Sequence, residues 1–544
     1  MTYPQNFETK IGFDNIRKLL KEKCLSTLGK SMVDGMTVSS KHATIGEWLE
    51  QTHEFRRIQE ESDDFPLQYF FDVRDAIRRI RLENTHLEED EIFDLRRSLQ
   101  TINDIVRYLR RGIDTDDSES TPTPLYPALY RLTDNVATYP QLVQAIDQIL
   151  DKFGHIKDNA SAELLAIRKE LARAENSVSK TLYGILRAAQ SEGLVDKDVT
   201  PTLRDGRLVI PVAPGLKRRI GGIVHDESAT GKTVFIEPAE VVEANNRIRE
   251  LESQERQEII RILTAFTNKV RPHSADILNS YTFLATIDFI RAKAELAKMT
   301  KAIEPQLSEH PHIDWIQARH PLLELSLAKQ EKKIVPLDII LNSEKHILII
   351  SGPNAGGKSV CLKTVGLLQY MLQCGLSIPV GDRSTAGIFD NIMIDIGDEQ
   401  SLENDLSTYS SHLLNMKNMM RQADGRTLIL IDEFGTGTEP QIGGAIAEAV
   451  LEQLLRKGAW GVITTHYQNL KHFADSHEGV ANGAMLYDRH EMKALFQLAI
   501  GRPGSSFAIE IARKTGLPEE VIRQASDIVG SDYIQSDKYL QDIV

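Results

Sequence analysis

A glycine-rich segment that ends in a lysine and a serine has the residue types and spacing of a phosphate-binding loop. It fits the pattern G-x-x-x-x-G-K-[ST] and directly follows the apolar run 345–350. In such a loop, backbone N–H groups close around phosphate oxygens at the positive end of the next helix. The lysine would reach the β- and γ-phosphates of a nucleotide, and the serine would bind Mg²⁺. The segment consists of Gly352, Pro353, Asn354, Ala355, Gly356, Gly357, Lys358 and Ser359.

Two adjacent carboxylates, Asp432 and Glu433, end a second apolar run at 427–431. Asp432 would hold the Mg²⁺ shell, and Glu433 would orient or deprotonate an attacking water. If the pair stood alone, a solvated strand end would explain it. A glycine-rich loop that stood alone could likewise be a turn that matches the pattern by chance. The presence of both in one region favours the hydrolysis of a nucleoside triphosphate.

His466 ends a third apolar run, 460–465. Most single histidines have structural roles, but this position at a strand end makes His466 a candidate sensor of the γ-phosphate. From about residue 313, such runs alternate with helix-like segments, which predicts a parallel sheet covered on both faces. Sheets of this kind bind ligands beyond the carboxyl ends of their strands, where all three motifs would lie.

The preceding residues, up to about 305, have mainly helical patterns. Apolar residues three and four apart predict one long amphipathic helix, with Ile92, Leu95, Leu99, Ile102, Val106 and Leu109 on its buried face. Short apolar runs punctuated by Gly and Pro over 199–238 predict a small β-rich module. A long charged helix is predicted from Val241 to about Thr300. The β-rich module between long helices would form an arm with a tip.

Composition limits the class of protein. The chain has 544 residues, enough for several domains, and a net charge of −14, so any nucleic-acid binding must use a local basic patch. Three cysteines without metal-ligand spacing are expected in a reducing cytoplasm. No secretory signal or membrane-spanning run is present in the sequence.

Several motifs together resemble the ATPase motifs of the MutS family. They are the 352–359 loop, Arg319-His-Pro321, Ser407-Thr-Tyr-Ser-Ser-His412, Asp432-Glu-Phe-Gly-Thr-Gly-Thr-Glu439 and Thr464-Thr-His-Tyr467. The second bacterial MutS subfamily is the closer resemblance, through Arg207-Leu-Val-Ile-Pro-Val212, Gly222-Ile-Val-His-Asp-Glu-Ser228, Phe235-Ile-Glu-Pro238 and Asp395-Ile-Gly-Asp-Glu-Gln-Ser401. The resemblance implies an ATPase of the ATP-binding-cassette type that uses ATP and Mg²⁺ and works as a homodimer.

The resemblance also implies roles for further residues. Ser407 is similar to the signature serine that meets the γ-phosphate bound by the other subunit, and the run 435–439 is similar to a loop at the same interface. Gln400 is a weaker candidate for sensing Mg²⁺ and water. Ile334 and Val335 lie where the family presents an apolar contact to adenine.

The expected fold is therefore multidomain: an all-helical core and lever region with a β-containing clamp insert, followed by an α/β P-loop domain. The expected boundaries are 1–160 for the core, 161–240 for the clamp arm, 241–305 for the returning lever helices, 306–530 for the ATPase domain and 531–544 for the start of a helical linker. The mismatch-reading domains of repair MutS proteins have no counterpart here. A small MutS-related (Smr) nuclease domain has none either, so no nuclease activity is expected of this chain.

The predicted clamp carries the basic patch. Residues 204–232 hold six Lys or Arg and three Asp or Glu, and the patch is densest at Lys217, Arg218 and Arg219. Such residues would bind phosphates without reading bases, although a solvated basic loop is the plainer alternative. The partner would be branched or duplex DNA, as for a recombination suppressor, or the ribosome, as for a factor that splits collided ribosomes. A scaffold for partner proteins is a third, weaker possibility.

Overall fold

The computed structural model divides the chain into two compact units. The first comprises residues 1–65, 112–132 and 285–544, and the second comprises 66–111 and 133–284. Within these ranges the structure describes residues 1–61, 65–67, 70–113, 123–193, 195–204, 206–353, 356–397, 408–488, 491, 493–505 and 507–529.

A seven-stranded sheet forms the centre of the first unit. Neighbouring strands are parallel, except that the last pair is antiparallel. The strand order is β1 (Thr2–Tyr3), β13 (Asn391–Asp395), β14 (Thr427–Ile431), β15 (Trp460–Thr464), β11 (Lys345–Ser351), β16 (Gly479–Asp488) and β17 (Lys493–Ile500). The three apolar runs that the sequence predicts as strands are β11, β14 and β15, so these predictions are confirmed.

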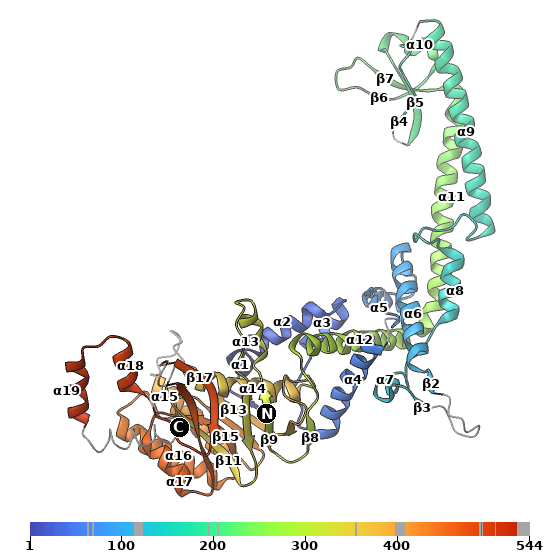
Figure 1. Ribbon diagram of the computed structural model, residues 1–544. Coiled ribbons are helices and arrows are strands. Elements are labelled where there is room, and N and C mark those ends of the chain that lie inside the picture. Colours follow the sequence, from blue (N-terminus) through green and yellow to red (C-terminus); the bar gives the residue numbers. More distant parts are fainter. Residues whose placement is uncertain are drawn as a thin grey trace. The chain divides into compact units, whose positions relative to one another are not determined.

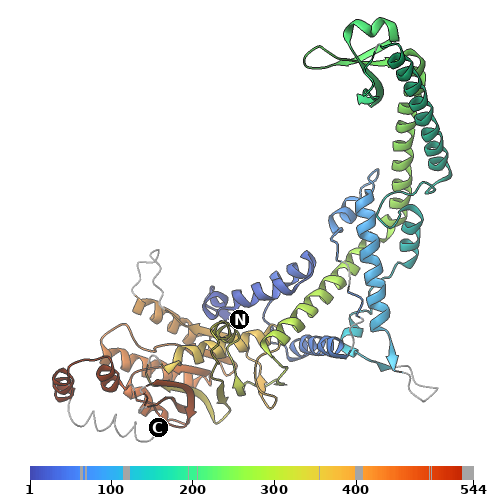
Figure 2. The same ribbon diagram turned by 45° about the horizontal axis from the view of Figure 1, so that its top comes forward.

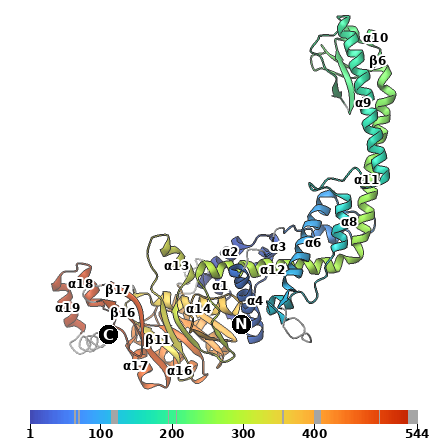
Figure 3. The same cartoon turned by 45° about the vertical axis from the view of Figure 1, so that its right-hand side comes forward.

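Helices cover both faces of this sheet (Figure 3). Successive residues of a strand point to opposite faces, and β11 shows this directly. Leu348 and Ile350 join one core with α14 (Lys358–Gln373), whereas Ile347 and Ile349 join another. That second core includes α15 (Thr408–Gln422), α16 (Pro440–Arg456) and α17 (Gln468–Ser476). Burial on both faces explains why the strands are continuous apolar runs.

A second sheet and the helices near the start of the chain extend the core on the α14 side. This second sheet, in the order β10 (Leu337–Leu341), β9 (Ile313–Ala318), β12 (Thr385–Gly387) and β8 (Gln306–Ser308), buries Trp315 there. Phe7 and Phe13 contact the Tyr370 ring of α14. The other elements of the first unit are α1 (Phe7–Ile11), α2 (Phe13–Lys23), α3 (Thr27–Asp34), α4 (His42–Glu61), β2 (Gly112–Ile113), β3 (Thr123–Pro124), α7 (Pro127–Arg131), α13 (Pro321–Ala328), α18 (Ala508–Lys514) and α19 (Glu519–Val529).

Two long helices dominate the second unit. They are α9 (Ala162–Ser191) and α11 (Ala239–Val270), which run side by side and carry a four-stranded antiparallel sheet at one end (Figures 1 and 2). The sheet order is β4 (Thr202–Arg204), β5 (Arg207–Val212), β7 (Val234–Pro238) and β6 (Gly222–Glu227). The unit also contains α5 (Arg74–Arg79), α6 (Glu89–Leu109), α8 (Pro140–Ile149), η1 (Pro214–Leu216) and α10 (Lys217–Ile220).

The helix predicted from Val241 to Thr300 is interrupted. A 3₁₀ turn, η2 (Arg271–His273), separates α11 from α12 (Ser274–Thr300). Pro272 lies in this turn, and a proline cannot donate the backbone hydrogen bond that a continuous helix requires there. Helix α12 begins in the second unit and ends in the first.

A buried carboxylate holds the base of the small sheet to α11. The Glu237 side chain is fully buried and accepts hydrogen bonds from Arg207 (2.7 Å), His225 (2.6 Å) and Asn245 (2.7 Å). Burial alone would raise the pKa of Glu237, but these hydrogen bonds outweigh it and lower the pKa below its ordinary value. Arg207 is therefore part of the internal structure of this module.

Two observations bear on the environment of the protein. Cys24, Cys361 and Cys374 are buried free thiols. Among the described residues, no helix is both long and apolar enough to cross a bilayer.

Candidate functional site

The described part of the 352–359 loop has the backbone geometry of a close approach to a ligand. Gly352 and Gly357 have φ angles of 135° and 95°, which favour glycine. A Cβ atom at Gly357 would lie 3.1 Å from the ring of Phe496, so a larger residue would not fit without movement. Gly357 caps the N-terminus of α14 with no side-chain hydrogen bond, which leaves N–H groups of the first turn for a ligand. Asn354 and Ala355 lie outside the described residues.

Lys358 is held inside this loop. Its side chain is buried, and its Nζ atom donates a hydrogen bond to the Gly352 carbonyl at 2.6 Å. A second contact, at 3.4 Å, joins Nζ to Nε2 of His466. Burial lowers the pKa of Lys358 to about 8, although the carboxylates of Glu433 and Asp432 act in the opposite direction. The structure thus brings the lysine of the first motif to the histidine of the third.

His466 accepts from this lysine as a neutral imidazole. Burial, together with the nearby charges of Lys358 and Lys471, lowers the pKa of His466 to about 4. Below neutral pH the ring therefore stays uncharged until well into the acid range. A neutral imidazole offers one N–H donor and one acceptor nitrogen, which suits contact with a phosphate oxygen from one side and an ammonium from the other.

Asp432 and Glu433 share one positioning residue, Thr464. The Thr464 hydroxyl donates to Oδ1 of Asp432 at 2.5 Å and accepts from the backbone N–H of Glu433 at 2.8 Å. Glu433 has a φ angle of 50°, in the left-handed region that costs a non-glycine residue about 1–3 kcal/mol. Its carbonyl accepts from both the N–H and the hydroxyl of Thr436. These contacts hold a strained turn that leaves the Glu433 side chain exposed.

Ser359 and Asp432 supply suitable ligand types for Mg²⁺. Ser359 lies in the first turn of α14, and within the described ranges its hydroxyl makes no hydrogen bond. Asp432 is partly exposed, and of its two carboxylate oxygens only Oδ1 accepts a hydrogen bond from a described residue. Hydroxyl and carboxylate oxygens are the hard ligands that Mg²⁺ prefers. The residues present therefore fit the metal.

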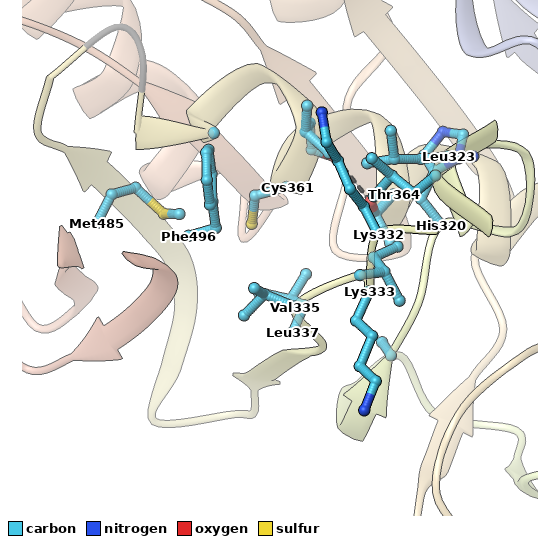
Figure 4. Close-up of a pocket in the computed structure, with 15 residues that line it drawn as sticks. His320, Leu323, Lys332, Lys333, Val335, Leu337, Cys361, Thr364, Met485 and Phe496 are labelled. Carbon is cyan, nitrogen blue, oxygen red and sulfur yellow. Dashed lines mark hydrogen bonds between the residues drawn. The ribbon is translucent and has the colours of Figure 1, made fainter. Parts of the chain in front are cut away.

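A largely apolar cavity of about 680 Å³ opens beside Gly357 (Figure 4). Phe496 and Met485 form one side, Val335 and Leu337 lie at the centre, and Lys332 lies on the other side with the labelled residues His320 and Leu323. The backbone of Phe496 has a φ angle of 56°, which is unfavourable for a residue other than glycine. Its half-exposed ring lies at the edge of the cavity. Other lining residues are Ala318, Leu327, Lys333, Ile334, Val360, Cys361 and Thr364.

Comparison with known proteins identifies the family. The family description "MutS domain V" matches residues 348–531. A protein called "Endonuclease MutS2" from a Geobacillus species is 38% identical over 520 residues, which is 96% of this chain and 64% of the relative. Proteins of the same name from Enterococcus faecalis and Thermomicrobium roseum are 35% and 38% identical over 99% and 98% of this chain, and each is covered to 66%. The chain belongs to the MutS2 subfamily. The resemblance seen in the sequence motifs is thereby confirmed.

The chain spans 64% to 66% of the length of these MutS2 relatives. The word "endonuclease" is part of their names and describes those proteins. The expectation that this chain cuts no nucleic acid stays a prediction.

Two of the motifs that resemble the MutS family meet in a buried network that the sequence did not predict. Asp395, at the end of β13, is 1% exposed and accepts from His412 of α15 at 2.7 Å and from Asn415 at 2.9 Å. Asn415 in turn accepts from the Tyr3 hydroxyl at 2.7 Å. The network therefore joins the end of β13 to α15. The sequence contains both motifs, but nothing in their spacing indicates that they pair.

Some predicted site residues lie outside the described residues, namely Ser407 and Gln400. Helix α15 begins directly afterwards, at Thr408. In the following 435–439 run, Gly435 and Gly437 have φ angles of 87° and 98°. Glu439 caps α16 by accepting from the N–H groups of Gln441 and Ile442.

Lys217, Arg218 and Arg219 are exposed on the single turn of α10. Three consecutive residues can contact one nucleic-acid backbone together only from a loop or a turn. The structure has a 3₁₀ turn, η1, followed by the helical turn α10 at this position. Within the described part of the chain, none of the three forms an ion pair. Two other basic residues of this region are engaged, because Arg207 binds Glu237 and Arg204 pairs with Asp226 at 3.5 Å.

Proposed function

We propose that this chain is an ATPase whose substrate is the complex of ATP with Mg²⁺. The observation that carries the proposal is the convergence of Lys358 and His466, in direct contact, with Asp432 and Glu433, whose charges act on Lys358. These four residues come from three separate motifs at the carboxyl ends of β11, β14 and β15, where parallel sheets bind ligands.

Each residue of the site has a role that follows from its chemistry. Lys358 exchanges the Gly352 carbonyl for β- and γ-phosphate oxygens, while N–H groups of the loop bind the same phosphates. Ser359 and Asp432 hold Mg²⁺, which neutralises developing phosphate charge when bound. Glu433 orients and deprotonates the attacking water, and Thr464 fixes its backbone. Neutral His466 donates to the γ-phosphate.

The cavity beside Gly357 takes the base of the nucleotide. It adjoins the phosphate loop and is lined mainly by apolar side chains, as is usual for sites that bind aromatic rings. Ile334 and Val335, which the MutS resemblance assigns to adenine, belong to its lining. Phe496 adds an aromatic ring at the edge of the cavity.

The active form is a homodimer in which Ser407 of each subunit completes the site of the other. This part of the proposal comes from the signature motif of the MutS family. A mixed dimer of one Ser407→Arg subunit and one Lys358→Ala subunit should therefore keep one intact site, because the intact Lys358 and the intact Ser407 meet. The two homodimers should both be inactive.

The measurement is ATPase activity of mixed dimers purified through two different affinity tags. About half of the wild-type rate is expected for one site of two. An inactive mixed dimer would contradict a site shared between subunits.

The second unit grips nucleic acid through the sheet β4–β7 and α10. The support is the exposed Lys217-Arg218-Arg219 turn, which binds phosphates without reading bases. We propose branched or duplex DNA as the partner and suppression of recombination as the outcome, in the cytoplasm, where buried free thiols stay reduced. Stimulation of the ATPase by stalled ribosomes and not by four-way-junction DNA would instead favour the splitting of collided ribosomes.

Reversing the charge of Lys217, Arg218 and Arg219 to Glu should weaken DNA binding regardless of sequence. Each lost phosphate contact lowers the log–log salt slope by about 0.9, so the slope should fall by up to about three units. The matched control is a triple reversal of Lys169, Arg173 and Lys180, exposed basic residues on α9 that carry the same change in charge. The test is binding of duplex and four-way-junction DNA across a salt series. A slope equal to that of the control would mean that α10 is only solvated surface.

A further inference from the structure

Three arginines gather at the C-terminal end of α6 in the second unit. Arg107, Arg110 and Arg111 line one cavity of about 380 Å³. Arg107 lies in the last turn of α6, Arg110 caps the C-terminus of that helix, and Arg111 follows directly. The opposite wall comes from Thr138 and Pro140, and the remaining lining residues are Asn103 and Val106.

The charge in this cavity is only partly neutralised. Arg107, whose side chain is largely solvated, pairs with the partly buried Asp104 at 3.2 Å. Arg110 is fixed by the Thr133 carbonyl at 2.9 Å and the Thr133 hydroxyl at 3.3 Å. Arg111 lies 5.1 Å from the centre of the Tyr108 ring. Among the residues that the structure describes, neither Arg110 nor Arg111 has a carboxylate partner, so two oriented guanidinium groups keep their charge.

The opposite wall adds to the positive potential. Pro140 is the first residue of α8, and the preceding Tyr139 does not cap that helix with its side chain. N–H groups in the first turn of α8 therefore stay available, with the positive end of its dipole. The backbone N–H of Tyr139 is used within the wall, because it donates to Asn103 Oδ1 at 3.1 Å.

Stabilisation of α6 is the simpler explanation for cations at this position, since they favour the negative end of a helix. That effect needs no opposing wall and falls off within the last turn. It also does not require two arginines that converge on a cavity with a helix N-terminus on its far side. The combination has the chemistry of an anion site, in which guanidinium groups bind phosphate through paired N–H donors.

We propose that this arginine cavity binds a backbone phosphate of nucleic acid, as a second contact besides α10. The inference rests on the proposed nucleic-acid function. Among the described residues that line the cavity there is no aromatic ring on which a base could stack, so the site favours the sugar–phosphate backbone over a free nucleotide. Binding there would not depend on sequence.

The test compares Arg111→Glu with Arg81→Glu. Arg81 is exposed and precedes α6 at its other end, so both variants carry the same charge change and bracket the same helix. Binding of duplex DNA is measured across a salt series, with melting temperature as the check on folding. We expect Arg111→Glu to weaken binding and to lower the salt slope by about 0.9, and Arg107→Glu/Arg111→Glu to lower it by up to about twice that amount. Arg81→Glu should leave the slope unchanged.

The outcomes separate this inference from the broader proposal. Equal slopes for Arg111→Glu and Arg81→Glu, with loss of binding in the α10 triple variant, would overturn the arginine cavity and leave the nucleic-acid function standing. No loss in any of these variants would remove both. Inorganic triphosphate that protects Arg111 from a guanidinium-modifying reagent, while DNA does not, would show a small-anion site and overturn the proposal as well.

Discussion

Replacing Glu433 with Gln should leave ATP bound and slow its hydrolysis by about 10²–10⁴-fold, the usual contribution of a general base. Glutamine keeps the size of the side chain but cannot take a proton from water. The backbone of Glu433 is held by Thr464 and Thr436, so the turn should persist in the variant. Loss of rate without loss of binding is therefore the expected pattern.

Single-turnover hydrolysis and nucleotide titration of the same sample separate these two effects. Glu452→Gln is the matched control, because Glu452 lies on the solvent side of α16 and pairs with Arg456. The control should hydrolyse ATP at the wild-type rate. Turnover near wild type in Glu433→Gln would mean that another group activates the water.

Replacing Lys358 with Ala should remove measurable ATP binding. Its ammonium is buried and points at the loop carbonyl of Gly352, where phosphate oxygens would take over the contact. Removing one partner of a buried charge pair costs about 3–5 kcal/mol, which corresponds to roughly 10²–10⁴-fold in affinity. Because wild type buries a lysine whose charged form burial disfavours, the variant should not be less stable than wild type in the absence of ATP.

Titration with a fluorescent ATP analogue and a thermal melt test both statements. Lys363→Ala is the control, since Lys363 lies on the same helix beyond the first turn. Unchanged affinity in Lys358→Ala would contradict the assignment of the phosphate loop.

The sequence predicted the central strands of the sheet, because their apolar runs can be recognised without knowing which strands they pair with. Runs such as 427–431 are apolar throughout because the strands are buried on both faces, and this makes them recognisable without any partner. The break at Arg271–His273 was missed, because a proline between two good helical patterns also permits a kinked helix. The addition of β1 to the sheet could not be predicted, since two residues carry no periodicity and their partner lies hundreds of residues away.

The site divides in the same way. The lysine, the carboxylates and the histidine were found because each follows a strand or a glycine-rich turn. Thr464 belongs to one of the motifs, but its link between Asp432 and Glu433 depends on the pairing of β14 with β15, which the sequence does not reveal. Met485 reaches the cavity from β16, which pairs with β11, and Phe496 reaches it from β17, which pairs with β16, and neither pairing can be read from local sequence.

The place of β1 at the sheet edge has a consequence for biosynthesis. Thr2 and Tyr3 pair with Ile392 and Met393, so during synthesis these two residues wait for a partner that is made much later. At about 5–20 residues per second, that interval is roughly 20–80 s. The nascent chain must carry Phe7 and Phe13 through this period without the α14 core that buries them. Apolar surface that stays exposed during synthesis makes a chain prone to aggregate, so the late pairing of β1 lengthens the period in which this protein is at risk.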